Sequence, residues 1–184
     1  MRTALFLSAL LLPLAACDTT GTDSSYELIG TFDIDPKGTY LRTNQDDANA
    51  PTTIDLAGLG IAPGDSIYVR ILGEVDLDPA SAVGGEPGAS SFTVAGVFSA
   101  SSALLAADQL DRVPGAIDVG PDIRTAPTAI GAIETDIPED ALINRNAFRV
   151  PAGATTLFLN IVDQFYSDND AESFTATVTR KQNL

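Results

Sequence analysis

The last third of the chain contains a strand, an acidic loop and a second strand, and this stretch constrains the fold most. In Glu172–Arg180, apolar residues alternate with Ser and Thr, which is the two-residue period of a strand with one buried face. The preceding segment Thr155–Val162 has Leu or Ile at every second position and further apolar residues between them. A strand that is apolar on both faces is predicted to lie inside a sheet rather than at its edge.

The loop between these strands, Asp163–Asp170, combines carboxylates with neutral oxygen donors and contains no basic residue. Hairpin loops usually have about two to five residues, so a longer connection requires a reason. Neighbouring carboxylates repel one another unless water or a cation intervenes. Calcium suits this inventory because it takes roughly six to eight oxygen ligands, although the DxDxDG spacing is absent. The loop is therefore either a calcium site or a solvated acidic turn.

The N-terminal segment Met1–Ala16 is predicted to be a lipoprotein signal peptide. Its apolar part, Ala4–Leu12, is too short to span a hydrocarbon core of about 30 Å. The sequence Leu-Ala-Ala-Cys that ends at Cys17 resembles a bacterial lipobox and uses the only cysteine of the chain, which excludes an intramolecular disulfide. We expect Cys17 to be acylated and to anchor the protein. The alternative is a secreted protein with a free thiol.

Residues 17–25 are predicted to be the lipidated cysteine and a flexible polar tether, and residues 26–184 a single domain long enough for a proper core. Frequent Gly and Pro turns and almost no helical periodicity predict an all-β, antiparallel β-sandwich. In the first strand we expect Tyr26, Leu28, Phe32 and Ile34 to point inward. One helical turn is expected at Ser102–Leu110, and loop from Arg112 to Thr128. The other expected strands are Thr39–Thr43, Thr52–Leu56, Ser66–Gly73, Ser91–Ser99, Ala129–Ile133 and Ala147–Val150.

The charge balance restricts the partners. The chain has a formal net charge of −15 and a pI near 4.1, and removing Arg2 with the signal peptide leaves nine basic and twenty-five acidic residues. This argues against nucleic acid and anionic lipid surfaces as partners and favours cations. It also fits a protein kept soluble by charge alone.

The missing residue types restrict the chemistry. The chain has no histidine, which excludes Ser-His-Asp and Cys-His catalysis as well as an imidazole zinc site. No glycine-rich phosphate loop occurs. With twenty-five acidic residues a carboxylate pair for glycoside hydrolysis is always available, so such a pair indicates nothing. The protein is predicted not to be an enzyme.

Two segments resemble a known family. Pro63–Gly73 (PGDSIYVRILG), and Leu157–Lys181 after the turn Val150–Gly153, resemble the bacterial calcium-dependent galactose-binding lectins of the PA-IL type. The resemblance covers about the last third of the chain well, whereas residues 76–149 match only loosely. It implies a jelly-roll-like, galactose-binding-like sandwich.

The resemblance also implies ligands, position by position. Asp163 matches a calcium-binding aspartate, Ser167 a residue that binds through its carbonyl, and Asn169 and Asp170 a pair that binds both calcium and sugar. A further carbonyl ligand falls near Leu77, between Asp76 and Asp78, so two acidic loops are expected to meet at one end of the sandwich.

The sugar site departs from the family pattern. The histidine that contacts the sugar in that family is missing, and Asp170 replaces an asparagine. Tyr166 or Phe165 is a candidate for stacking on a sugar face, and the alternative is that these rings pack in the core or within the loop. We expect a lipoprotein of the cell envelope, anchored to the inner or outer membrane with its domain in the periplasm or at the cell surface. It would bind carbohydrate with calcium; the alternative is a structural or protein-interaction lipoprotein in which calcium only stabilises loops.

Overall fold

The computed structural model describes residues 26–43, 46–73, 75–76, 94–119, 141–142, 147–163, 166–170 and 174–182. The predicted signal peptide, Cys17, the expected tether, Leu77 and the expected strand Ala129–Ile133 lie outside the described residues, as does Phe165.

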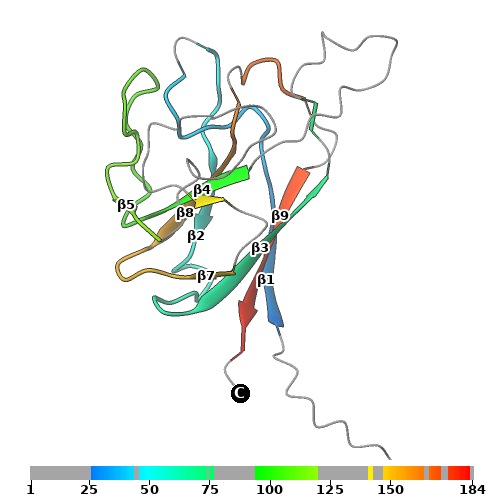
Figure 1. Ribbon diagram of the computed structural model, residues 1–184, viewed down its shortest axis with the longest axis vertical. Helices are drawn as coiled ribbons and strands as arrows, with labels where there is room; N and C mark the ends of the chain where they lie inside the picture. The colour runs from blue at the N-terminus through cyan, green and yellow to red at the C-terminus, as the bar shows by residue number, and fades with distance from the viewer. Residues whose placement is uncertain are drawn as a thin grey trace, which may run out of the picture.

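The described residues form two antiparallel sheets and no helix (Figure 1), which confirms the prediction of an all-β domain. The four-stranded sheet has the order β1 (Tyr26–Asp33), β9 (Phe174–Lys181), β3 (Ser66–Gly73) and β7 (Ala147–Arg149). The five-stranded sheet has the order β2 (Thr52–Asp55), β8 (Thr156–Ile161), β4 (Val94–Ser99) and β5 (Ala116–Ile117), and β6 (Ala141–Leu142) also pairs with β4. In this part of the chain, no helix has the length and hydrophobicity that a membrane-spanning segment requires.

Alternating apolar side chains hold the two sheets together. Ile67, Val69 and Ile71 of β3 and Ala176 and Val178 of β9 are buried in one core cluster, as the two-residue period predicts. The same cluster contains three residues of β8 from the other sheet: Leu157, Leu159 and Ile161. The sheets therefore pack face to face as a β-sandwich.

The outer face of the five-stranded sheet is also buried. Phe158 of β8 and Val97 of β4 pack there against Tyr40, Leu41 and Val113 from connecting segments. Strand β8 lies between β2 and β4, which confirms the prediction of an interior strand. The expected strand at Thr39–Thr43 is wrong: this segment is irregular and its side chains cover the sheet.

The expected helical turn at Ser102–Leu110 is also wrong. The Ala103 N–H bonds the Ser101 hydroxyl at 3.4 Å, and the Leu105 N–H bonds the Arg112 carbonyl at 2.8 Å, so the local hydrogen bonds replace helical ones. The segment after Arg112, expected to be loop, contains the short strand β5, which pairs with β4.

The direction of two side chains in β1 differs from the prediction. The pairing of β1 with β9 shifts between Leu28 and Gly30, which is the signature of a β-bulge. Leu28 and Tyr26 are consequently 64% and 54% exposed on the outer face, while Ile29 packs against the core. Phe32 and Ile34 point inward as expected.

The acidic connection between β8 and β9 is not a hairpin. Strand β8 belongs to the five-stranded sheet and β9 to the four-stranded sheet, so the chain must cross from one layer of the sandwich to the other. This crossing explains the length of the connection. In Figure 1 the connection lies at the end of the sandwich opposite the C-terminus and the beginning of β1. We call the described residues gathered there, 35–43, 46–49, 75–76, 163 and 166–170, the acidic end.

Candidate functional site

The acidic end is assembled from three distant parts of the chain. The turn after β1 is closed by the Gly38 N–H, which donates to the Asp35 carbonyl at 3.0 Å. The segment after β3 meets the segment before β9, because Asp76 and Asp170 exchange two backbone hydrogen bonds of 2.9 Å. The two acidic loops therefore meet, as expected. Leu77 lies just beyond the described residues.

Asn169, which directly precedes Asp170 in the chain, is buried with no exposed surface. Its Nδ2 donates to the Pro36 carbonyl at 2.9 Å, which fixes the orientation of the amide. Its Oδ1 is buried and has no hydrogen-bond donor among the described residues. A buried carbonyl oxygen without a partner costs about 1–3 kcal/mol, so this atom calls for a cation or a water molecule.

A second buried amide lies close by. Asn160 is fully buried on β8 and donates from Nδ2 to the Thr39 hydroxyl at 3.1 Å, whereas its Oδ1 has no donor in the described part of the chain. The interior next to the acidic end therefore holds two amide oxygens in need of a partner. Internal water molecules commonly fill this role in proteins.

Ser167 is exposed, and its carbonyl already contacts a cationic side chain. The Lys37 Nζ donates to the Ser167 carbonyl oxygen at 2.9 Å. This ammonium ties the turn after β1 to the loop before β9. It also occupies the oxygen that the lectin resemblance assigns to calcium, so Lys37 and a metal ion would compete for this atom.

Asp46 is a residue that sequence reasoning missed. Its carboxylate accepts hydrogen bonds from the backbone N–H groups of Tyr166 and Ser167, the latter at 3.1 Å. Desolvation by burial acts to raise the pKa of Asp46, but hydrogen bonds from the Ser167 hydroxyl and from backbone N–H groups outweigh it and lower the pKa. The residue lies in a polar stretch with no distinguishing motif.

Tyr166 is buried, with 2% of its surface exposed. Its hydroxyl lies 3.5 Å from the Asp163 N–H, which donates to it, and burial raises the pKa of the phenol. The ring therefore presents no open face on which a sugar could stack. Asp163 is half-buried and Asp170 is exposed.

The carboxylates alone do not form a dense metal cluster. Within the described residues, no group of three or more Asp, Glu, Cys or His side chains is placed so that it could hold a metal ion. A cation at the acidic end would have to combine single carboxylates with amide and backbone oxygens. Calcium accepts such a set, because it binds carbonyl and amide oxygens as well as carboxylates.

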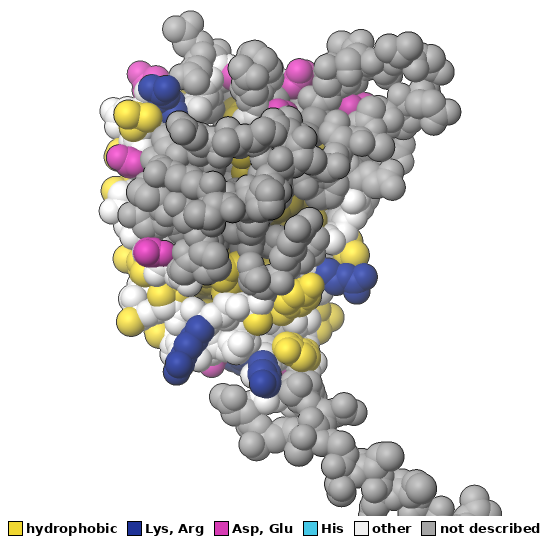
Figure 2. Space-filling model, in the orientation of Figure 1, with side chains coloured by type: hydrophobic (Ala, Val, Ile, Leu, Met, Phe, Trp, Pro, Cys, Tyr) yellow, Lys and Arg dark blue, Asp and Glu magenta, His cyan; other side chains and the backbone are white. Residues whose placement is uncertain are grey.

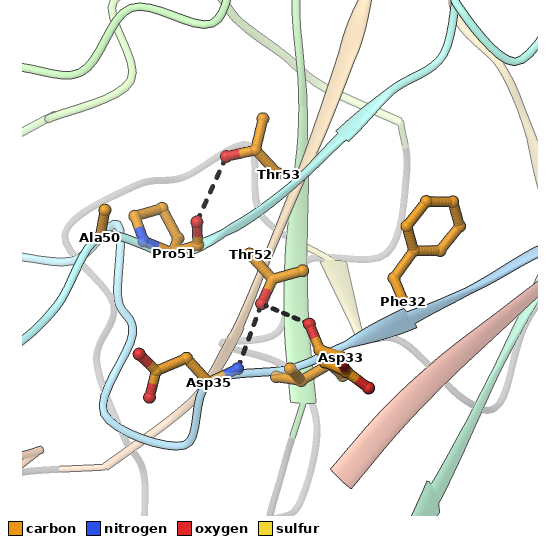
Figure 3. Close-up of a pocket in the computed structure, with 8 residues that line it drawn as sticks. Phe32, Asp33, Asp35, Ala50, Pro51, Thr52 and Thr53 are labelled. Atoms are coloured by element: carbon orange, nitrogen blue, oxygen red, sulfur yellow. Dashed lines mark hydrogen bonds between the residues drawn. The ribbon is translucent and has the colours of Figure 1, made fainter.

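A hollow of about 480 Å³ lies beside the acidic end, between the end of β1 and the beginning of β2 (Figure 3). The Thr52 hydroxyl bridges its floor, donating to the Asp33 carbonyl and accepting from the Asp35 N–H, both at 3.3 Å. Phe32 and Thr53 also line it, so an aromatic ring and polar groups surround the hollow.

No protein-family model matches the chain, and it matches neither a curated protein nor a solved structure. The lectin resemblance therefore stays a prediction.

Proposed function

We propose that the protein is a non-enzymatic lipoprotein of the bacterial cell envelope, anchored through acylated Cys17, whose sandwich binds calcium at its acidic end. The observation that carries the calcium proposal is Asn169, whose Oδ1 is fully buried without a donor among the described residues. It lies where the paired residues Asp76 and Asp170 bring two acidic loops together.

The ligands in this proposal are the Asn169 Oδ1, the carboxylates of Asp163 and Asp170, the Ser167 carbonyl and the backbone carbonyl of Leu77. When bound, calcium would neutralise neighbouring carboxylates and satisfy the buried amide oxygen. Because Asn169 is closed in by Pro36 and has no exposed surface, it cannot also reach a sugar hydroxyl. This favours a calcium ion that only stabilises the loops, and therefore a structural or protein-interaction role for the domain.

Thermal unfolding with and without calcium tests the proposal, using two variants that remove the same charge from the same loop. Asp163→Asn removes a half-buried proposed ligand, whereas Asp168→Asn removes an exposed carboxylate outside the proposed set. We expect calcium to raise the melting temperature of the native protein and of Asp168→Asn, but not that of Asp163→Asn. A melting temperature that calcium and chelator leave unchanged in all three proteins would mean that water fills the site.

Calcium-dependent carbohydrate binding is the second candidate, and the hollow beside the acidic end favours it. Phe32 offers a half-buried aromatic ring, and Asp33, Thr52 and Thr53 offer hydrogen-bonding groups. A glycan array probed with and without calcium distinguishes the two roles. Binding that chelator abolishes would support the lectin role, and an array without any binding would leave the structural role.

The strand order supports the jelly-roll-like, galactose-binding-like topology that we propose with this function. If the two-residue β6 is left aside, consecutive strands of the chain alternate between the two sheets. The one exception is the pair β4 and β5, which are consecutive and lie in the same sheet. Jelly rolls combine two Greek keys across two sheets in this manner.

A further inference from the structure

The outer face of the four-stranded sheet carries a combination of basic and apolar side chains that differs from the acidic end. Directly paired residues of neighbouring strands point to the same face of a sheet. Tyr26 pairs with Lys181, Leu28 and Tyr68 both pair with Thr179, and Ser66 pairs with Arg149. The residues of β3 that alternate with these, Ile67, Val69 and Ile71, are buried in the core. We call this outward surface the basic face, defined by Tyr26, Leu28, Arg70, Leu72, Arg149 and Lys181.

Exposed apolar residues concentrate on the basic face. Of the large hydrophobic side chains that are exposed in the described part of the chain, Leu28, Tyr26 and Leu72 lie here, at 64%, 54% and 43% exposure. The bulge in β1 is responsible for two of them, because it turns Tyr26 and Leu28 away from the core. Soluble proteins seldom gather such side chains on one surface without a partner.

Basic residues are concentrated on the same face. Arg70, Arg149 and Lys181 are exposed, and none of them has a salt-bridge partner among the described residues. Arg180, which lies on the opposite side of β9, is instead paired with Glu27 and Asp65. The only described acidic residue in register on this face is Asp33, at its far end. In a chain of net charge −15, this separation of charge is pronounced.

Figure 2 shows the same separation from one side. Basic and hydrophobic side chains lie together on the lower part of the molecule, where β1 begins and β9 ends in Figure 1. Most acidic side chains in view lie higher, toward the acidic end. Strand β1 begins with Tyr26 at this lower end (Figure 1).

We infer that the basic face lies against the anionic phospholipid headgroups of the membrane that holds the anchor. The inference rests on the proposed acylation of Cys17. A tether of residues 17–25 reaches at most roughly 30 Å from the lipid to Tyr26 and averages about 15–18 Å. Exposed basic side chains are attracted to anionic headgroups, and Tyr and Leu enter the interface between headgroups and acyl chains. The net charge of the whole chain predicts repulsion from such lipids, but the acidic and the basic side chains lie on different parts of the surface.

A tryptophan probe tests this docking directly, because the chain contains no tryptophan. The full-length acylated protein is reconstituted into vesicles of phosphatidylglycerol and phosphatidylcholine with brominated acyl chains. Leu28→Trp places the probe on the basic face, and Leu110→Trp places it at a 55% exposed position outside that face. We expect the emission of Leu28→Trp to shift to the blue and to fall by roughly half or more, and that of Leu110→Trp to stay unchanged.

The charge dependence is tested with two single reversals in the Leu28→Trp background. Arg70→Glu changes an exposed arginine on the basic face, and Arg42→Glu changes an exposed arginine outside it. We expect Arg70→Glu, but not Arg42→Glu, to reduce the quenching. Vesicles of phosphatidylcholine alone are expected to give little quenching.

The failure of docking and the failure of the anchor give different results. Flotation of the protein with vesicles, together with the mass of the N-terminal peptide, reports on the acylation of Cys17. A protein that floats but leaves Leu28→Trp unquenched overturns the docking inference, and would leave the basic face to a partner protein. A protein that does not float contradicts the anchor itself.

Discussion

At the scale of single residues, the acidic end shows how a neutral amide and one lysine connect its loops through backbone carbonyls. Asn169 donates to the Pro36 carbonyl and leaves its buried Oδ1 without a donor among the described residues, whereas Lys37 donates to the Ser167 carbonyl. The lysine holds the loops together when no ion is bound. It also repels an incoming cation, so affinity for calcium depends on both residues.

Replacing Lys37 tests this competition. Lys37→Met removes the ammonium from the Ser167 carbonyl while keeping much of the apolar stem. The repulsion between this ammonium and a cation bound close to it near the protein surface is on the order of 1 kcal/mol. We therefore expect the calcium affinity measured by calorimetry to rise about three- to tenfold. Lys181→Met, which makes the same charge change at the opposite end of β9, is expected to leave the affinity unchanged. An unchanged or weaker affinity in Lys37→Met would show that Ser167 is not a ligand.

Asp46 gives the acidic end a pH dependence. The folded pKa of this carboxyl is lowered below its ordinary value of 3.8, so its stabilising contribution is present at neutral pH and disappears as the pH falls below 3.8 toward the folded pKa. With chelator present, we expect Asp46→Asn to be less stable than the native protein by roughly 1 kcal/mol at pH 7. The reason is that the N–H groups of Tyr166 and Ser167 would then donate to a neutral amide oxygen instead of a carboxylate. The difference is expected to shrink in acid unfolding below pH 3.8. A difference that grows with acidity would contradict this assignment.

At residue scale the sequence was a partial guide to this site. The acidic character of Asp163–Asp170 and its meeting with Asp76 were predictable, because charge clustering and loop position are local or carried by the resemblance. The role of Asp46 was not predictable, since it lies 120 residues from Tyr166 along the chain and only the fold brings them together. For Tyr166 the sequence left sugar stacking and core or loop packing open, and the structure shows the buried alternative.

At the scale of elements, β8 is the strand on which both layers of packing depend. Its even and odd positions are both buried, one set in the core between the sheets and the other under the segments 39–43 and 100–116. The apolar residues on both faces predicted an interior strand. They could not predict what covers the outer face, because those segments have no strand or helix pattern of their own.

Truncating Phe158 tests whether this cover is part of the fold. Phe158 points away from the core between the sheets but is only 1% exposed. We expect Phe158→Ala to lower the free energy of unfolding by about 3–5 kcal/mol, comparable to Leu159→Ala on the opposite face. Thr53→Ala on the edge strand β2, an exposed position, is expected to change it by less than about 0.5 kcal/mol. Urea unfolding measures all three. A small effect of Phe158→Ala would mean that the cover opens in solution.

At the same scale, the bulge in β1 shows where pattern reasoning fails. A one-residue shift in pairing reverses the direction of every side chain before it. The presence of Gly30 in the sequence is not sufficient to predict this shift. The inward assignment of Tyr26 and Leu28 was wrong for this reason. The same shift creates the apolar part of the basic face.

At the scale of the whole molecule, two different ends lie on one sandwich. The acidic end gathers carboxylates from three loops, and the opposite end carries the beginning of β1 with Tyr26, Arg149 and Lys181 of the basic face, whereas Leu72 lies on the same row as Asp33, toward the acidic end. Composition predicted the all-β class correctly, because frequent turns and short alternating segments leave few other solutions. It could not predict that β8 and β9 belong to different sheets, since pairing partners are set by contacts between distant segments.

Calorimetry on the soluble domain from Asp18 onward tests the claim that the acidic end binds calcium. The native domain is titrated with calcium beside the double variant Asp163→Ala and Asp170→Ala. We predict one binding event in the native domain and none in the double variant, because the two carboxylates supply the charge that the neutral oxygens lack. Binding that persists in the double variant would place the ion elsewhere. The absence of binding in both proteins would contradict the claim and leave a sandwich whose acidic end is held by hydrogen bonds alone.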